Sequence, residues 1–433
     1  MSQSVEITDK VRKMWREMTP GIEDGIRSCR QESFRLQIRD INGNRVPRAK
    51  VWAVQKTHDF DFGCNCLWLG QCGGENETYE RRIAELFNLV TTTFCLSDIQ
   101  PEEGTWRFEE DSPEVFRRPP VDRVVRFAKQ YGLRLKGQPL LAGSWYPAWA
   151  AGKRLGNDAI KELYTDYFRR VAERYGKVFD QFDLVNEALL HTSFPLYTKN
   201  LDYVVWAFKT ARSIFPSRVK LSLNEATGWG FDEKAGDGKN QYFNLIRRLL
   251  DCGVKPDSIG FQFHLWNTVE GVIRGEGRYT LEEIRDRLRE FSEFGIPMYI
   301  TEITIPSVIS GIRCESIQAE VLEQFYRLFF SIPNLRGILQ WNLCDGRAWK
   351  SEGDCCGGIV DEFLRKKPSY LALEHLLNRE WKTAVEMEAD ENGTLEFRGF
   401  RGEYDLTIET DGRKRTLPLQ RLNSSAVNEF ILV

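Results

Sequence analysis

Two glutamates in this chain could perform acid–base and nucleophilic chemistry as a pair. Glu187 ends the segment 182–187 and Glu302 ends the segment 297–302, and each segment has the composition of a buried strand. Two carboxyl groups flanking a glycosidic bond can cleave it, because one protonates the leaving oxygen while the other attacks the anomeric carbon or activates water. An ionised Glu302 would raise the pKa of Glu187 and keep that residue protonated as the acid.

Polar and aromatic residues at other predicted strand ends could bind a sugar around this pair. Asn186, beside the acid, can donate to a sugar 2-hydroxyl, and Gln262 can reach a ring hydroxyl. His264 can hydrogen-bond Glu302 and hold its rotamer, while tryptophan rings can stack on the apolar face of a sugar. Each residue type alone is common in protein cores, so the prediction depends on their occurrence together. The candidates are Asn186, Asn224, Gln262, His264, Trp341, Asp345 and Trp349.

Apolar runs alternate with longer amphipathic stretches from residue 60 onward. Eight strand–helix units in strict alternation predict an α/β fold, a closed parallel (β/α)₈ TIM barrel rather than an open sheet. The C-terminal ends of barrel strands share one face, so Glu187 on the fourth strand and Glu302 on the seventh would face each other across the barrel mouth. The expected strands are 60–67, 89–94, 134–141, 182–187, 219–224, 258–264, 297–302 and 337–343; the expected helices are 78–88, 121–131, 158–175, 201–215, 238–252, 281–294, 316–331 and 368–377.

The two ends of the chain predict a second, smaller unit. Residues 1–32 suggest a helix and linker, and residues 33–57 suggest a β-hairpin around the turn at 42–44. The barrel is expected over 58–381, followed by short glycine-punctuated strands in 382–433, including 395–398, 404–408 and 430–433. Neither end has enough apolar residues for a good core alone. We therefore expect them to pair into one accessory antiparallel β module, a small sandwich.

Composition excludes several classes of function. The chain has 433 residues, of which 42% are hydrophobic, enough for a barrel of roughly 250 residues plus additional elements. A net charge of −3 gives no reason to expect nucleic acid or an anionic membrane as partner. The N-terminus lacks the layout of a signal peptide, which predicts a cytoplasmic protein, although a secreted chain without its signal would look the same. The sequence leaves the oligomeric state open.

The cysteines and histidines do not indicate a metal centre. There are ten cysteines and four histidines, with a cluster at Cys64, Cys66 and Cys72 and an adjacent pair at Cys355 and Cys356. No Cys-x-x-Cys pair is repeated, so reduced and mostly buried thiols are the simpler expectation. We expect no metal and no other cofactor.

Several segments together resemble glycoside hydrolase family 10, which is best known for endo-β-1,4-xylanases with a retaining mechanism on a (β/α)₈ barrel. The resemblance implies that Glu187 is the acid/base and Glu302 the nucleophile. It also implies roles in sugar binding for Gln262, His264, Trp341 and Trp349. The match extends over roughly residues 60–378 and is carried by the segments 183–188, 260–265, 299–302, 339–345 and 367–370.

The chain departs from the family pattern after the second and third strands. There the family usually carries an asparagine and a lysine, then a histidine, a tryptophan and a second histidine, which recognise the glycone side of the substrate. Gln138 and Trp145 are candidate substitutes for part of that recognition. The aligned positions hold Thr92, Cys95, Gln138, Ala142 and Gly143.

The leading prediction is a retaining β-glycoside hydrolase that cleaves a xylan-like or related polysaccharide or oligosaccharide by double displacement. One alternative is an exo-acting β-glycosidase on short or decorated oligosaccharides. The other is a non-catalytic carbohydrate-binding barrel, against which the presence of Glu187, Glu302 and His264 argues.

Overall fold

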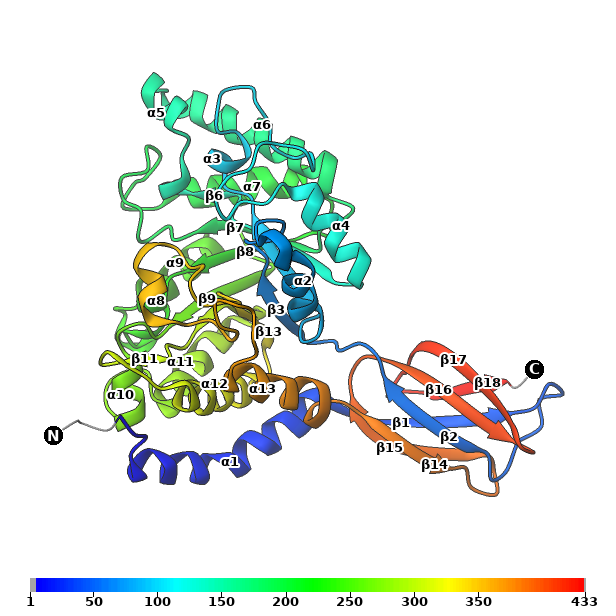
Figure 1. Ribbon diagram of the computed structural model, residues 1–433. Coiled ribbons are helices and arrows are strands. Elements are labelled where there is room, and N and C mark those ends of the chain that lie inside the picture. Colours follow the sequence, from blue (N-terminus) through cyan, green and yellow to red (C-terminus); the bar gives the residue numbers. More distant parts are fainter. Residues whose placement is uncertain (1–4, 432–433) are drawn as a thin grey trace.

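A closed barrel of parallel strands forms the centre of the molecule (Figure 1). The computed structural model describes residues 5–431. Parallel pairing of β13 with β3 and of β5 with β7 closes the ring, which confirms the predicted TIM barrel. The strands are β3 (Asp61–Asn65), β4 (Leu89–Thr93), β5 (Arg134–Gln138) with its continuation β6 (Leu141–Ala142), β7 (Gln181–Asn186), β8 (Lys220–Glu225), β9 (Ser258–His264), β10 (Met298–Thr304) and β13 (Leu335–Gln340).

Helices follow the strands and cover the outside of the barrel (Figure 1). Their starts have local causes: Asn240 and Thr280 accept backbone N–H groups as N-caps of α9 and α11, and Pro368 begins α13. The covering helices are α2 (Asn76–Ala84), α4 (Val121–Tyr131), α6 (Asn157–Tyr175), α7 (Asp202–Ile214), α9 (Gln241–Asp251), α11 (Leu281–Phe291), α12 (Glu315–Phe330) and α13 (Pro368–His375). Shorter elements lie in the connections: α3 (Leu96–Ile99), α5 (Ala148–Lys153), α8 (Thr227–Phe231), α10 (Val269–Arg274) and the β11 (Val308–Ile309)–β12 (Ile312–Arg313) pair.

The N-terminal segment is one long helix, α1 (Asp9–Arg30), with no linker after it. It buries Val11, Trp15 and Ile22 among other residues, and it contacts α10 and α12 of the barrel. The chain passes directly from Arg30 into strand β1 (Gln31–Arg39). The linker expected within residues 1–32 is therefore replaced by a helix that connects barrel and β module, and residues 1–4 lie outside the described chain.

The two ends of the chain form one β-sandwich beside the barrel (Figure 1). One sheet has the order β15-β1-β18 and the other β14-β2-β16-β17, and a separate apolar core lies between them. The strands are β1, β2 (Lys50–Gln55), β14 (Ala384–Glu388), β15 (Thr394–Phe400), β16 (Glu403–Thr410), β17 (Arg413–Arg421) and β18 (Val427–Ile431). Residues 432–433 of the expected last strand lie outside the described residues.

The expected hairpin of residues 33–57 is wrong in its pairing. β1 and β2 belong to different sheets, and β18 runs parallel to β1, so the module is not purely antiparallel. The apolar faces of the two strands, with Phe34 and Leu36 on one and Val51 and Ala53 on the other, enter the same core. Facing each other across a sandwich buries both faces, whereas lying side by side in one two-stranded sheet would leave them exposed.

No helix within residues 5–431 has the length and apolar character needed to cross a bilayer.

Candidate active site

A cavity of about 240 Å³ lies at the C-terminal ends of the barrel strands. Glu187, directly after β7, and Glu302, within β10, both line it. The cavity wall also contains most of the predicted binding residues, namely Gln138, Trp145, Asn186, Asn224, Gln262, His264, Trp341 and Trp349.

Glu187 is held by its backbone and by two side-chain partners. Its φ of 55° is unusual for a residue other than glycine, and its N–H donates to the carbonyl of Asn224 (3.0 Å). Oε2 lies 2.6 Å from Nε2 of His191, and Oε1 accepts a hydrogen bond from Gln262 (2.8 Å). Burial opposes ionisation, but the contacts with His191 and Gln262 outweigh it, and the pKa of Glu187 is lowered.

His191 is a site residue that sequence reasoning missed. It lies one turn beyond Glu187, and its N–H donates to the Glu187 carbonyl (3.2 Å). Gly143 makes room for it: a β-carbon at position 143 would lie 2.8 Å from the β-carbons of both His191 and Phe194. Two features of the sequence could have indicated it. His191 follows Glu187 by four residues, and Gly143 stands where the family pattern has a histidine.

Glu302 is more deeply buried than Glu187 and has a neutral histidine beside it. The two carboxylate side chains are 8% and 20% exposed, respectively. Nε2 of His264 lies 3.2 Å from Glu302 Oε2, and Nδ1 lies 2.9 Å from the hydroxyl of Thr304. Burial lowers the pKa of His264 to about 4, so the imidazole is neutral near pH 7 and can donate through Nε2 while accepting from Thr304.

The acidities of the two carboxyl groups are the reverse of the sequence expectation. Burial raises the pKa of Glu302 well above its usual value, and the charge of Glu187 adds to this effect. Glu187 was expected to hold the proton beside an ionised Glu302. In the free protein the proton is instead favoured on Glu302, because Glu187 has two polar partners and greater access to solvent.

Three amide side chains form a fixed network between the strand ends. Asn224 donates to the side-chain oxygen of Asn186 (2.8 Å) and accepts from the hydroxyl of Thr301 (2.6 Å). Gln262 completes the network through a longer contact with Asn186 (3.4 Å). A β-carbon at Gly260 would lie 2.3 Å from the Asn224 oxygen, so glycine at this position allows the network to form.

A buried ion pair lies below the cavity. Lys136 and Asp183 contact each other, and each side chain is 1% exposed. Lys136 also donates to the side-chain oxygen of Gln138 (3.3 Å). Burial raises the pKa of Asp183, while the charge of Lys136 opposes that rise. Lys136 therefore helps to orient Gln138. Its charge lowers the pKa of Glu302, while the charge of Asp183 raises it.

Aromatic rings surround the opening of the cavity. The ring centroids of Trp145 and Trp349 are 6.4 Å apart, and Trp341 follows strand β13 directly. Trp266, which sequence reasoning missed, stacks on the ring of His264 with 4.4 Å between centroids. Such rings can pack against the apolar faces of sugar units.

Two arginines from the loop before α4 also line the cavity, and neither was predicted. The guanidinium of Arg118 lies 4.8 Å from the ring centre of Trp145, and its Nε donates to Asp98 (2.6 Å). Arg117, which is 1% exposed, donates to Asn342 (3.3 Å) and approaches Glu352 (3.9 Å). Both arginines lie in a loop, where residue spacing is irregular, so the sequence pattern did not indicate either of them.

Asp345, unlike the other predicted binding residues, is not part of the cavity lining and lies in a buried ion pair. It forms a buried ion pair with Lys367 (3.0 Å), accepts the N–H of Gly358 (2.9 Å), and does not line the cavity. Without this carboxylate, Lys367 would be buried with no counter-ion at hydrogen-bond distance, which is costly.

The part of the chain that the structure describes contains no group of three or more His, Cys, Asp or Glu residues placed to hold a metal ion. All ten cysteines are free thiols. The cavity lining presents carboxyl, amide, imidazole and guanidinium groups and the thiol of Cys95.

The sequence pattern of glycosyl hydrolase family 10 matches residues 62–376. Endo-1,4-beta-xylanase B of Thermotoga neapolitana is 25% identical and covers 71% of this chain and 85% of its own length. Anti-sigma-I factor RsgI6 of Acetivibrio thermocellus is 25% identical over 92% of this chain, and endo-1,4-beta-xylanase 2 of Arabidopsis thaliana is 26% identical over 89%. The chain spans 48% and 33% of the lengths of these last two relatives.

Among solved structures, native xylanase 10B from Thermotoga maritima shares the barrel fold. Its TM-score is 0.60 at 22% identity, over 74% of this chain and 96% of that one. With the family pattern spanning the whole barrel and both of its glutamates, the chain belongs to glycosyl hydrolase family 10.

Proposed function

We propose that the protein is a retaining β-glycoside hydrolase, with Glu187 as acid/base and Glu302 as nucleophile. The observation that carries the proposal is that two carboxyl groups of unequal acidity line one cavity at the barrel mouth. These opposite pKa shifts favour a state with one carboxyl group protonated and the other ionised, which double displacement requires.

In the first step, the Glu302 carboxylate attacks the anomeric carbon and forms an ester bond. The glycosidic C–O bond breaks, and its oxygen takes the proton of Glu187. In the second step, a water attacks the same carbon, gives its proton to Glu187 and releases Glu302.

The proton must move from Glu302 to Glu187 before the first step. Positive charge develops on the sugar beside Glu302 and favours the ionised form of Glu302. The glycosidic oxygen can accept a hydrogen bond from a protonated Glu187. His264 donates to the carboxylate that forms on Glu302.

The substrate we propose is a β-1,4-linked xylan or a related glycan with altered contacts on the glycone side. The names of several relatives support a xylan-type substrate. Cys95 and Gln138, which depart from the family pattern, line the cavity. Trp145 and Arg118 line it beside them, and Arg118 donates to Asp98. Arg118 stacked on Trp145 provides both an apolar surface and hydrogen-bond donors, a combination that suits sugar hydroxyl groups.

The test compares wild-type protein with Glu302→Ala and Glu187→Ala variants on aryl β-xylosides and xylan. Loss of turnover in Glu302→Ala, and proton NMR showing the β-anomer as first product, are the expected results. Turnover that persists in Glu302→Ala, or an α-anomer formed first, would contradict the mechanism. Product sizes from a xylo-oligosaccharide ladder separate endo from exo action, and glycan binding without turnover on every substrate would indicate a carbohydrate-binding barrel instead.

A further inference from the structure

A second cavity, at the opposite end of the barrel from the two glutamates, is strongly cationic. It has a volume of about 350 Å³ and lies where helix α1, the start of strand β13 and the β module meet. Four of its seven lining residues are arginines and one is an acid: Arg30, His58, Asp59, Phe60, Arg336, Arg401 and Arg421. The geometry points to an oxyanion-binding site, for phosphate, sulfate or the carboxylate of an acidic sugar.

Arg30 is the main reason for this inference. It is 3% exposed, yet no carboxylate among residues 5–431 forms an ion pair with it. Its Nε and Nη2 donate to the carbonyls of Phe330 and Ile332, which leaves Nη1 without an acceptor in the described chain. Burial lowers the pKa of Arg30 to about 9, and the charges of Arg336 and Arg401 add to that effect. The guanidinium also lies over the rings of Phe60 (4.6 Å) and Phe330 (5.2 Å), so carbonyl groups and ring faces contact this buried cation while a counter-ion could still bind it.

The neighbouring arginines leave the cavity with excess positive charge. Arg336 donates only to the carbonyl of Pro333 (2.8 Å) and has no acidic partner in the described part of the chain. Arg401 approaches Glu32 at 3.6 Å, and Arg421 forms an ion pair with Asp59 (2.9 Å). Planar guanidinium groups from separate elements can each present two N–H donors to one oxyanion.

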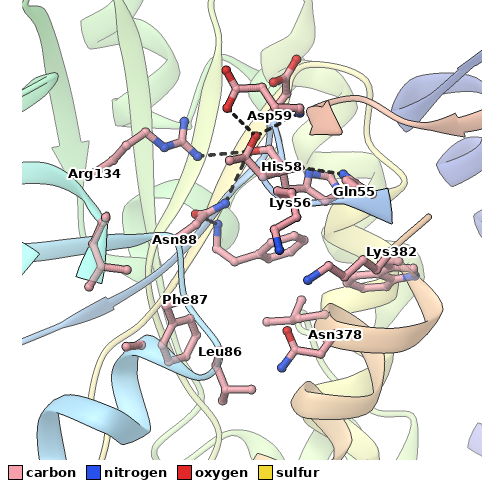
Figure 2. A pocket seen from close by; sticks show the side chains of 18 of the residues that line it. Gln55, Lys56, His58, Asp59, Leu86, Phe87, Asn88, Arg134, Asn378 and Lys382 are labelled. Carbon is pink, nitrogen blue, oxygen red and sulfur yellow. Dashed lines mark hydrogen bonds between the residues drawn. The ribbon is translucent and has the colours of Figure 1, made fainter. Parts of the chain in front are cut away.

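An adjoining cavity of about 540 Å³ shares His58, Asp59 and Arg421 with the first, and its lining contains acids as well as basic residues. Lys56 and Lys382 extend into this larger space (Figure 2). Burial lowers the pKa of Lys382, and the charge of Lys56 lowers it further. An anion larger than phosphate therefore has room to extend toward Lys56 and Lys382, although Glu85 and Glu403 line the same space.

The arginines come from parts of the chain that are distant in sequence. Arg30 ends α1, Arg336 lies at the start of β13, and Arg401 lies between β15 and β16. A bound oxyanion would connect the barrel to the β module by neutralising charges from both. The site would thus couple anion binding to the stability of the whole chain.

The test measures anion binding to the full chain by calorimetry and by thermal unfolding. Sodium phosphate, sodium sulfate and sodium glucuronate are compared with sodium chloride at equal ionic strength, because strongly hydrated anions stabilise proteins in general. Neutral glucose is the control for glucuronate. The variant is Arg336→Gln, whose exposed position preserves the fold, and the matched control is Arg289→Gln on the exposed face of α11.

We expect saturable binding and a raised Tm in wild type and Arg289→Gln, with about a tenfold loss of affinity in Arg336→Gln. Binding of phosphate or sulfate alone would assign the site to an inorganic anion, and binding of glucuronate but not glucose to an acidic sugar. Absence of binding heat in wild type, or equal affinities and Tm shifts in all three proteins, would overturn the inference. Xylan hydrolysis is measured separately, so failure here leaves the proposed activity untouched.

Discussion

Nε2 of His191 lies 2.6 Å from the carboxylate of Glu187, four residues earlier in the loop that follows β7. This contact and the hydrogen bond from Gln262 lower the pKa of Glu187 despite its burial. The acidity of the proposed acid/base therefore depends on a histidine that the loop itself supplies.

Replacing His191 with Asn should shift the pH dependence of catalysis. Loss of the imidazole removes a contact that favours the charged form of Glu187, so the pKa of Glu187 should rise. The acid limb of the kcat/KM profile, where Glu187 takes up a second proton and the pair loses its carboxylate, should move up by about one pH unit. The exposed His375→Asn variant on α13 is the control. An acid limb that stays in place or moves down would refute this dependence.

Gly143→Ala should reproduce much of that effect. The added β-carbon would approach the β-carbons of His191 and Phe194 to 2.8 Å, so the loop must shift. We expect the acid limb to move in the same direction, and the double variant with His191→Asn to add little, because both changes disrupt one contact. Gly152→Ala is the matched control, because a β-carbon added at position 152 would meet no atom within 4 Å. Fully additive effects would show that the two residues act independently.

Periodicity predicted the barrel because buried parallel strands have a strong signature. The predicted segments 182–187 and 297–302 correspond closely to β7 and β10. The third strand was expected to be continuous over 134–141, but it breaks between β5 and β6 at Pro139, which has no N–H to donate.

Loops and pairing partners were harder to predict, for physical reasons. Alternation showed that β1 and β2 each have one apolar face, but it cannot tell whether two such faces share a sheet or oppose each other across a core. His191 and Arg118 come from loops, whose conformations depend on tertiary contacts rather than on spacing. Asp345 was placed in the site because it follows a strand, yet Lys367 holds it elsewhere.

Arg118→Met tests the proposed glycone-side contacts. The change keeps an unbranched side chain of similar length but removes the charge, the hydrogen bond to Asp98 and the guanidinium face over Trp145. KM for xylo-oligosaccharides should rise by about tenfold, since a charged hydrogen bond contributes roughly 1.5–3 kcal/mol. Arg126→Met, at an exposed ion pair on α4, is the control. An unchanged KM for every oligosaccharide length would exclude Arg118 from substrate recognition.

Asp345→Asn should affect stability rather than substrate binding. The change leaves Lys367 buried without its counter-ion, and each side chain of the pair is only 2% exposed. The expected loss of unfolding free energy is about 3–5 kcal/mol, measured by urea denaturation, with KM of the remaining folded enzyme unchanged. Asp166→Asn at the exposed pair with Arg170 should cost less than about 1 kcal/mol. A raised KM at unchanged stability would indicate that Asp345 takes part in substrate binding.

Glu225 should make the stability of the protein fall as pH rises. It is buried at the end of β8, and its Oε1 accepts the N–H of Leu189 (3.1 Å) in the loop that carries Glu187. Burial raises the pKa of Glu225 to about 8, from an ordinary value of 4.5. Between these values the folded state holds a proton that the unfolded state has released. The unfolding free energy should therefore fall with increasing pH, by at most roughly 1.4 kcal/mol per unit.

Glu225→Gln keeps an oxygen acceptor for Leu189 but cannot titrate. Its unfolding free energy should therefore decline less steeply than that of wild type between about pH 5 and pH 8, as measured by urea denaturation across that range. The exposed Glu293→Gln variant should follow the wild-type curve. Parallel curves for wild type and Glu225→Gln would mean that the Glu225 carboxyl ionises without cost in the folded protein, and that the buried proton beside the Glu187 loop does not exist.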